Sequence, residues 1–309
     1  MTKFIIKRII YMIPVIIAVT FAIFTLSFMA AGDAARILAE KKYEHPSVQQ
    51  VEEVRHEQGL DRPIIIQYAE WLKKVLHGDF GNSYSTGKPA INELKYCFPQ
   101  TAKLAITALV ILVLVSVPLG ILSAVKESTT IDHIIQGFAF FSVSMPSFWL
   151  GLMLLFFFGV KLKVISVIGG NTGGIPILAA IALDIGNFGV LIRLVRTNVM
   201  HVMRQDYIRA SRAKGLSAGK VIMKHGLKNS IIPVMTRMVG MIISAFYGSA
   251  VIESIFSIQG IGKLALEAVT TKDTPVLQCF ILFLSVGVVL INLLIDILYS
   301  LIDRRIQLT

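Results

Sequence analysis

The stretch from Leu104 to Val125 reads LAITALVILVLVSVPLGILSAV, and it contains no charged side chain between Lys103 and Lys126. A helix needs roughly 20 apolar residues to cross about 30 Å of hydrocarbon, so this run is long enough to span a membrane. Three more uncharged runs of similar length occur in the sequence: Ile9 to Gly32, Ile134 to Val160 and Thr274 to Ile295. Four membrane-spanning helices are therefore predicted from uncharged runs alone.

Two further apolar segments contain charged residues. Ile175 to Val195 carries Asp184 and Arg193, and Ile231 to Phe256 carries Arg237 and Glu253. With both included, the sequence predicts an all-α integral membrane protein with six transmembrane helices. Hydrophobic residues make up 55% of the chain and charged residues only 16%, which excludes an ordinary soluble domain.

The first span has an alternative interpretation as a cleaved signal peptide, because Met29-Ala30-Ala31 resembles a cleavage site. Its apolar stretch is longer than the 7 to 15 residues of a signal core. We therefore favour an uncleaved anchor helix.

The basic residues predict the orientation of the spans. The segment 193–233 holds nine Lys or Arg against one acid, Asp206, and Lys3, Lys7 and Arg8 precede the first span. The positive-inside rule places both regions, and both chain termini, in the cytoplasm. The segment 33–100 is then extracytoplasmic, and its nine basic and ten acidic residues are nearly balanced. Lys161 and Lys163, in a short outer loop, disagree with this orientation.

This topology divides the chain into consecutive parts. Residues 1–32 form an N-terminal anchor helix, residues 33–100 a mostly helical extracytoplasmic insertion, residues 101–302 the core membrane domain with a cytoplasmic loop at 196–232, and residues 303–309 a short cytoplasmic tail. Within the insertion we expect a helix beginning near Ser47 and a break at Gly59. A further helix is expected to carry a packed face formed by Tyr68, Trp71, Leu72 and Leu76.

The cytoplasmic loop contains the stretch QDYIRASRAKGLS at 205–217. Gly215 suits the left-handed residue just past a helix end, and Ser217 can cap the helix that follows. Ala210, Ser211 and Ala213 are small enough to let another backbone approach, while Arg209, Arg212 and Lys214 add positive charge. The stretch is either a docking element for a partner protein or a solvated loop that only follows the topology.

This stretch resembles the coupling loop of ABC importer permeases, whose general pattern is Glu-Ala-Ala, three residues, then Gly. The matching positions are Arg209, Ala210, Ser211 and Gly215. Arg in place of Glu, and Pro233 at eighteen residues after Gly215, are features of the dipeptide, oligopeptide and nickel branch. Other similar blocks are Arg212-Ala213-Lys214-Gly215-Leu216, the segment 225–233, Gly59 to Pro63, Gly78 to Gly81, Ser116 to Gly120, Ser144 to Trp149 and Glu253 to Phe256. Gln259 departs from this branch, where Pro is common.

The resemblance implies the type I importer permease fold and a subunit of an ATP-driven importer in the inner membrane. It also implies partners: a second similar permease, two ATPase subunits that bind ATP and Mg, and an extracytoplasmic substrate-binding protein. The coupling residues would be Arg209 to Gly215. The sequence itself has no phosphate-binding loop, because Gly215 to Val221 has the wrong spacing and lacks the hydroxyl for magnesium. We expect no catalytic residue, no resident cofactor or metal, and no nucleic-acid partner.

Residues inside the spans suggest a translocation pathway. Asp184 lies near the middle of its span, where an ionisable group usually faces a partner or a watery cavity, and pairing with Arg193 or Arg237 is the structural alternative. Met145, Pro146 and Ser147 interrupt the third span, since Pro146 removes a backbone hydrogen bond. Glu253 is expected to reach the outer surface. A proton-coupled secondary transporter using Asp184 remains the alternative function.

Overall fold

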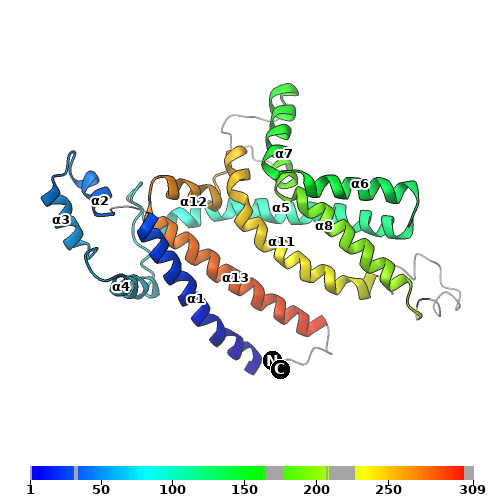
Figure 1. Ribbon diagram of the computed structural model, residues 1–309, viewed down its shortest axis with the longest axis horizontal. Coiled ribbons are helices and arrows are strands. Elements are labelled where there is room, and N and C mark those ends of the chain that lie inside the picture. The colour runs from blue at the N-terminus through cyan, green and yellow to red at the C-terminus, as the bar shows by residue number, and fades with distance from the viewer. Residues whose placement is uncertain (1, 31–33, 165–176, 207, 209–226, 303–309) are drawn as a thin grey trace. The chain divides into compact units, whose positions relative to one another are not determined.

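The computed structural model describes residues 2–30, 34–164, 177–206, 208 and 227–302. Within these ranges the chain is helical and has no β-strand, only an isolated bridge between Asn82 and Pro89. The helices are α1 (Thr2–Ala30), α2 (Ala34–Lys42), α3 (Val48–Glu57), α4 (Ile64–Leu76), α5 (Ala90–Val125), α6 (Thr130–Ser144), α7 (Ser147–Leu154), the π-helix η1 (Leu155–Lys161), α8 (Ile177–Met203), α11 (Leu227–Ile255), α12 (Ile261–Thr270) and α13 (Thr274–Ile302), as Figure 1 shows. The predicted all-α class is confirmed.

Long apolar helices account for much of the chain. In the part that the structure describes, three helices are long and apolar enough to cross a membrane, namely α5, α8 and α13, and the bent pair formed by α6 and α7–η1 makes a fourth if it counts as one span. The remaining two predicted spans coincide with α1 and α11, each 29 residues long. The count of six spans stays a prediction.

The chain forms two compact units, residues 1–98 with 264–309 and residues 99–263. In the first unit, α1 packs along α13, and α4 of the insertion packs on α1. Tyr68 joins these two helices because its hydroxyl lies 2.8 Å from the Thr20 hydroxyl, and its ring contacts Phe21 and Phe24 edge to face. The insertion therefore rests directly on the anchor helix.

The insertion follows its local sequence signals closely. Ser47 caps α3 through a capping box with Gln50, which satisfies two backbone N–H groups at the start of the helix. Gly59 breaks the chain after α3 with φ of +65°, a conformation that glycine adopts without strain. The predicted helix start and break are therefore confirmed. The predicted packed face is wrong at Leu76, which is 78% exposed at the last turn of α4.

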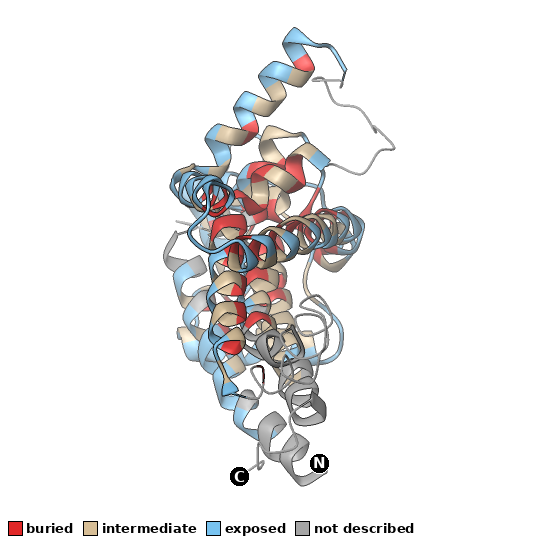
Figure 2. Ribbon diagram, turned by 90° about the vertical axis from the view of Figure 1, so that its right-hand side faces the viewer, coloured by how far each residue is buried: buried red, intermediate tan, exposed pale blue. Residues whose placement is uncertain are grey.

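In the second unit α8 is the central helix, with α6, α7 and α11 packed around it. From Ala182 onward its buried residues fall on one broad face, while Arg193 and Thr197 on the opposite side are exposed. Two glycines permit close approaches to α8 or from it. A Cβ at Gly120 of α5 would lie 2.7 Å from Val195, and one at Gly189 would collide with the Ala139 carbonyl oxygen of α6. The buried residues are red in Figure 2.

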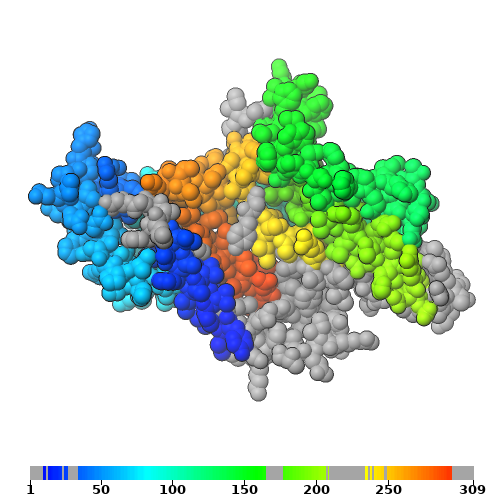
Figure 3. Space-filling view, in the orientation of Figure 1, coloured from blue at the N-terminus to red at the C-terminus, as the bar shows by residue number. Residues whose placement is uncertain are grey.

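The third predicted span is broken. α6 ends at Ser144, α7 begins at Ser147, and the chain bends by 101° between the two arms. Pro146 is the N-cap of α7, directly before its first residue. An N–H at this position has no partner within the helix, so its absence in proline costs no intrahelical hydrogen bond. The predicted interruption is confirmed, and the bend is sharper than a proline kink in a continuous helix. Both arms can be followed in green in Figures 1 and 3.

Candidate translocation pocket and its supporting contacts

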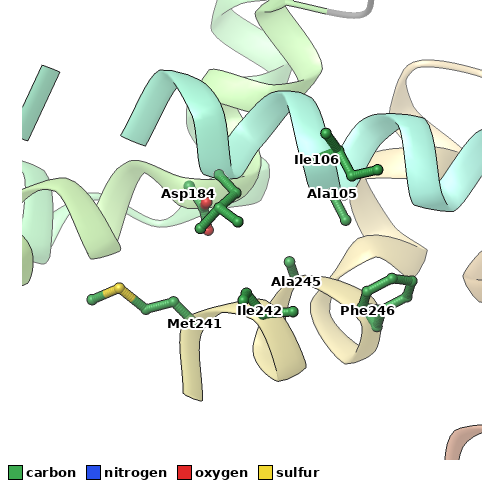
Figure 4. Close-up of a pocket in the computed structure, with 8 residues that line it drawn as sticks. Ala105, Ile106, Asp184, Met241, Ile242, Ala245 and Phe246 are labelled. Carbon is green, nitrogen blue, oxygen red and sulfur yellow. The ribbon is translucent and has the colours of Figure 1, made fainter. Parts of the chain in front are cut away.

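Asp184 lines a small pocket between α5, α8 and α11 in the second unit. Ala105, Ile106 and Leu109 contribute the α5 wall, and Met241, Ile242, Ala245 and Phe246 contribute the α11 wall. Figure 4 shows the Asp184 carboxylate between these two walls. The cavity volume is about 40 Å³, far below the roughly 300 to 1,000 Å³ typical of sites that enclose a whole ligand. Every lining side chain except Asp184 is apolar.

Asp184 is only 2% exposed and has few hydrogen-bond partners. The Asn187 side-chain amide donates a hydrogen bond of 2.8 Å to its Oδ1. Neither arginine considered as a partner reaches it among the described contacts, since Arg193 donates to the Gly189 carbonyl and Arg237 is exposed. Among the described residues Asp184 therefore has an amide partner and no ion-pair partner.

The other predicted pathway residues lie elsewhere in the second unit. Met145 packs against the hydrophobic cluster around α8, Pro146 is exposed and Ser147 is partly exposed at the start of α7. None of the three lines the Asp184 pocket. The structure thus does not bring them together with Asp184 in one pocket, and their role in the pathway stays a prediction.

The predicted coupling residues, Arg209 to Gly215, lie outside the described residues. The structure does describe the end of α8 that leads to them. There Arg204 forms an exposed ion pair of 2.7 Å with Glu127 of the α5–α6 turn, and Ile208 packs against Val202. The coupling role therefore rests on the sequence.

A buried ion pair joins the first turn of α6 to α8. Arg196 donates two hydrogen bonds to Asp132, from Nε to Oδ1 at 2.9 Å and from Nη2 to Oδ2 at 2.7 Å. The Ser123 hydroxyl and the Ser128 backbone N–H donate to the same carboxylate, and Asp132 is 3% exposed. Sequence reasoning missed this cluster. The available signal was an acid and a base at the same end of two neighbouring predicted spans.

Glu253 corrects another expectation. It was expected at the outer surface, but its side chain is completely buried. Its carboxylate accepts hydrogen bonds from the Thr101 hydroxyl at 2.6 Å and from the Lys263 backbone N–H at 2.8 Å, and Thr101 in turn accepts from the Ile261 N–H. A Cβ at Gly260 would collide with the carboxylate. Burial is favourable here because Glu253 and Thr101 together cap the first turn of α12.

A fourth buried carboxylate, Asp273, anchors the insertion within the first unit. Asp273, at the start of α13, accepts from the Ser83 hydroxyl at 2.5 Å and from the backbone N–H groups of Tyr84 and Ser85 at 3.0 Å each. Burial and the neighbouring Asp273 carboxylate raise the pKa of the Tyr84 hydroxyl. The loop that follows Gly78 to Gly81 is thereby fixed to the last helix.

Comparison with known proteins identifies the family. A family model described as "Binding-protein-dependent transport system inner membrane component" matches residues 116–308, and the N-terminal model of such membrane components matches residues 1–108. The chain belongs to this family. Proteins called "Glutathione transport system permease protein GsiC" from Shigella boydii serotype 4 (strain Sb227) and Escherichia coli (strain K12) are each 34% identical to it over 307 residues. The protein of that name from Salmonella choleraesuis (strain SC-B67) is 33% identical, and each alignment covers 99% of both chains.

The permease is thus a multi-pass inner-membrane subunit of an ABC importer, and it is a transport component rather than an enzyme. This confirms the resemblance inferred from the coupling loop and the other sequence blocks. Nothing in the comparisons supports the alternative of a proton-coupled secondary transporter.

Proposed function

We propose that this permease forms half of the membrane pathway of an ATP-driven importer for small peptides. The observation that supports a peptide cargo is the 34% identity along 99% of the chain with permeases named for the transport of glutathione, which is itself a tripeptide. Dipeptides and oligopeptides belong to the same chemical class. Nickel chelates are the remaining cargo that the sequence pattern allows.

The permease is proposed to work with a second similar subunit, two ATPase subunits and an extracytoplasmic binding protein. The binding protein delivers the cargo, and the permease pair opens to one side of the membrane at a time. ATP and Mg are held by the ATPase subunits, and residues 209–215 convert ATPase closure into movement of α8 and α11. Since α8 contacts α6, α7 and α11, a displacement of its cytoplasmic end reaches most of the second unit.

Uptake by the complete transporter, reconstituted in liposomes, tests the proposed function. Radiolabelled glutathione and trialanine should accumulate only when ATP is enclosed with the ATPase subunits, and a protonophore should leave their uptake unchanged. A nickel chelate is measured in parallel. Uptake that follows an imposed proton gradient without ATP, or uptake of the nickel chelate alone, would refute the proposal.

The coupling role is tested by Ala210→Trp and Gly215→Val. A large side chain at Ala210 should prevent close approach to the ATPase, and a β-branched residue at Gly215 should strain a helix end of positive φ by about 1 kcal/mol or more. Both variants should insert normally but lose ATPase subunits during purification or hydrolyse ATP without uptake. The matched controls are Ala218→Trp and Gly219→Val in the same loop. Wild-type uptake and ATPase retention in both test variants would contradict the role.

The proposed orientation is tested by cysteine labelling at Ser85 in the insertion. With both termini cytoplasmic, Ser85→Cys should react with a membrane-impermeant maleimide added from the extracytoplasmic side. Labelling only from the cytoplasmic side would invert the topology.

A further inference from the structure

We propose that the Asp184 pocket binds the free ammonium group of the cargo. This inference rests on the proposed function, because it names the chemical feature by which the permease would recognise a peptide. Its starting point is a carboxyl side chain that is 2% exposed and belongs to the lining of a space with apolar walls.

The first step concerns the incomplete set of partners around Asp184. A carboxylate offers about four acceptor positions, and the Asn187 amide fills one of them at 2.8 Å. Taking a charged group out of water is unfavourable unless it is paired and hydrogen-bonded. In the part of the chain that the structure describes, no cationic side chain is bonded to Asp184. The site therefore favours a positively charged hydrogen-bond donor that arrives from outside the subunit.

The second step excludes a bare metal ion as that cation. Divalent cations need several oxygen, nitrogen or sulfur ligands, and Asp184 is the only lining residue with a side chain of this kind. A search of the described residues finds no group of three or more His, Cys, Asp or Glu that could hold a metal. An ammonium group needs less, since one carboxylate and one amide oxygen can satisfy its N–H donors while the walls contact carbon atoms.

The third step concerns shape. The walls next to the carboxylate include two alanines, Ala105 and Ala245, which leave room, and both are at least 95% buried. A cavity of about 40 Å³ has room for a group the size of an ammonium and not for a whole residue. The pocket would thus hold the ammonium group of the cargo while the rest of the peptide extends away from it.

The test compares a peptide that has an ammonium group with one that lacks it. Trialanine and N-acetyltrialanine are supplied to the reconstituted transporter, each at a concentration that saturates the binding protein. Asp184→Asn keeps the shape of the side chain and can still accept from Asn187, but it removes the charge. We expect it to lower uptake of trialanine roughly tenfold or more, the typical effect of losing a charge-assisted hydrogen bond. Uptake of N-acetyltrialanine should stay within about twofold of the wild type or rise.

Asn187→Ala is the matched control, because it removes the hydrogen-bond partner and retains the carboxylate. If the Asp184–Asn187 contact is only structural, both substitutions should reduce uptake of both peptides equally. That outcome, like an unchanged preference in Asp184→Asn, would overturn the inference. The inference would also be overturned if Asp184→Asn lost uptake of both peptides equally and the second permease subunit no longer copurified with it. Asp184 would then pair with a cation of that subunit. ATP-independent uptake by the wild type, by contrast, would refute the proposed function itself.

Discussion

Asp132 and Asp184 are equally buried, at 3% and 2% exposure, but they differ in how their charge is balanced. Asp132 receives two hydrogen bonds from Arg196 of α8, one from the Ser123 hydroxyl and one from the Ser128 backbone. Asp184, on α8 itself, receives one from the Asn187 amide. Burial alone does not distinguish the two carboxylates, whereas the number and charge of their donors does.

The other buried carboxylates resemble Asp132. Glu253 accepts from the Thr101 hydroxyl and from the Lys263 N–H in the first turn of α12, and Asp273 accepts from the Ser83 hydroxyl and the Tyr84 N–H in the insertion loop. These groups hold segments together that are distant in the sequence. Asp184 is the exception, which is why we assign a ligand to it and a structural role to the others.

The largest effect is expected from Asp132→Ala. This substitution leaves the partly buried Arg196 without its bidentate partner, and breaking such a pair from one side typically costs about 3 to 5 kcal/mol. The free energy of unfolding, measured for the purified complex in detergent, should fall by about this amount. Glu127→Ala is the control, because it breaks the exposed ion pair with Arg204, which is worth about 1 kcal/mol or less. If both variants lost the same free energy of unfolding, the buried Asp132–Arg196 pair would be no more stabilising than the exposed Glu127–Arg204 pair.

The next effect concerns the contact that holds α8 against α6. Gly189→Ala places a methyl group against the Ala139 carbonyl oxygen, and overpacking of this kind costs about 1 to 3 kcal/mol. Gly186→Ala, on the same helix, meets open space and should raise stability by up to about 1 kcal/mol through helix propensity. Opposite shifts of the thermal unfolding midpoint are therefore expected. Equal shifts would mean that α6 and α8 are not in close contact at Gly189.

A smaller loss is expected from Glu253→Gln, which is nearly isosteric. The new amide can accept from only one side and presents donors toward the Thr101 hydroxyl or the Lys263 N–H. Such a mismatch should cost about 1 to 2 kcal/mol. Glu53→Gln, at an exposed position of α3, should change stability by less than about 0.5 kcal/mol. The midpoint of thermal unfolding is compared for the two variants, and an unchanged midpoint for Glu253→Gln would show that its carboxylate does not cap α12.

The smallest effect is expected from Asp184→Asn on stability in the absence of cargo. The amide relieves the burial of a charge and keeps a hydrogen bond with Asn187, so the free energy of unfolding should stay unchanged or rise by up to about 1 kcal/mol. Asp132→Asn in the same assay should be clearly destabilising. Should Asp184→Asn lose as much stability as Asp132→Asn, the two carboxylates would have the same structural role.

The sequence predicts features that depend on neighbouring residues. Ser47 with Gln50, Gly59 and Pro146 each act within a few positions, and the structure confirms the helix start, the break and the interrupted span. Uncharged runs likewise predict the long helices, because a helix that spans lipid needs about 20 consecutive apolar residues.

Contacts between distant segments leave no such trace. Asp132 and Arg196 are 64 positions apart, and Thr101 and Glu253 are 152 apart, so neither pair has a periodic pattern in the sequence. The expectation that Glu253 reaches the surface was wrong because the capping partners come from α5 and α12. The Asp184 pocket was predicted only as far as its acid, because its walls are ordinary apolar residues of two other helices.

The anchor between Ser83 and Asp273 bears on the order in which the protein is made. The two residues are 190 positions apart, and the carboxylate that fixes the loop belongs to the residue directly before the last helix. If the insertion is extracytoplasmic, as the charge pattern predicts, it crosses the membrane long before Asp273 leaves the ribosome. Its loop then has no anchor until the last helix has been made. A chain truncated before Asp273 would lack the carboxylate that bonds to Ser83, Tyr84 and Ser85, and this loop would stay without its anchor.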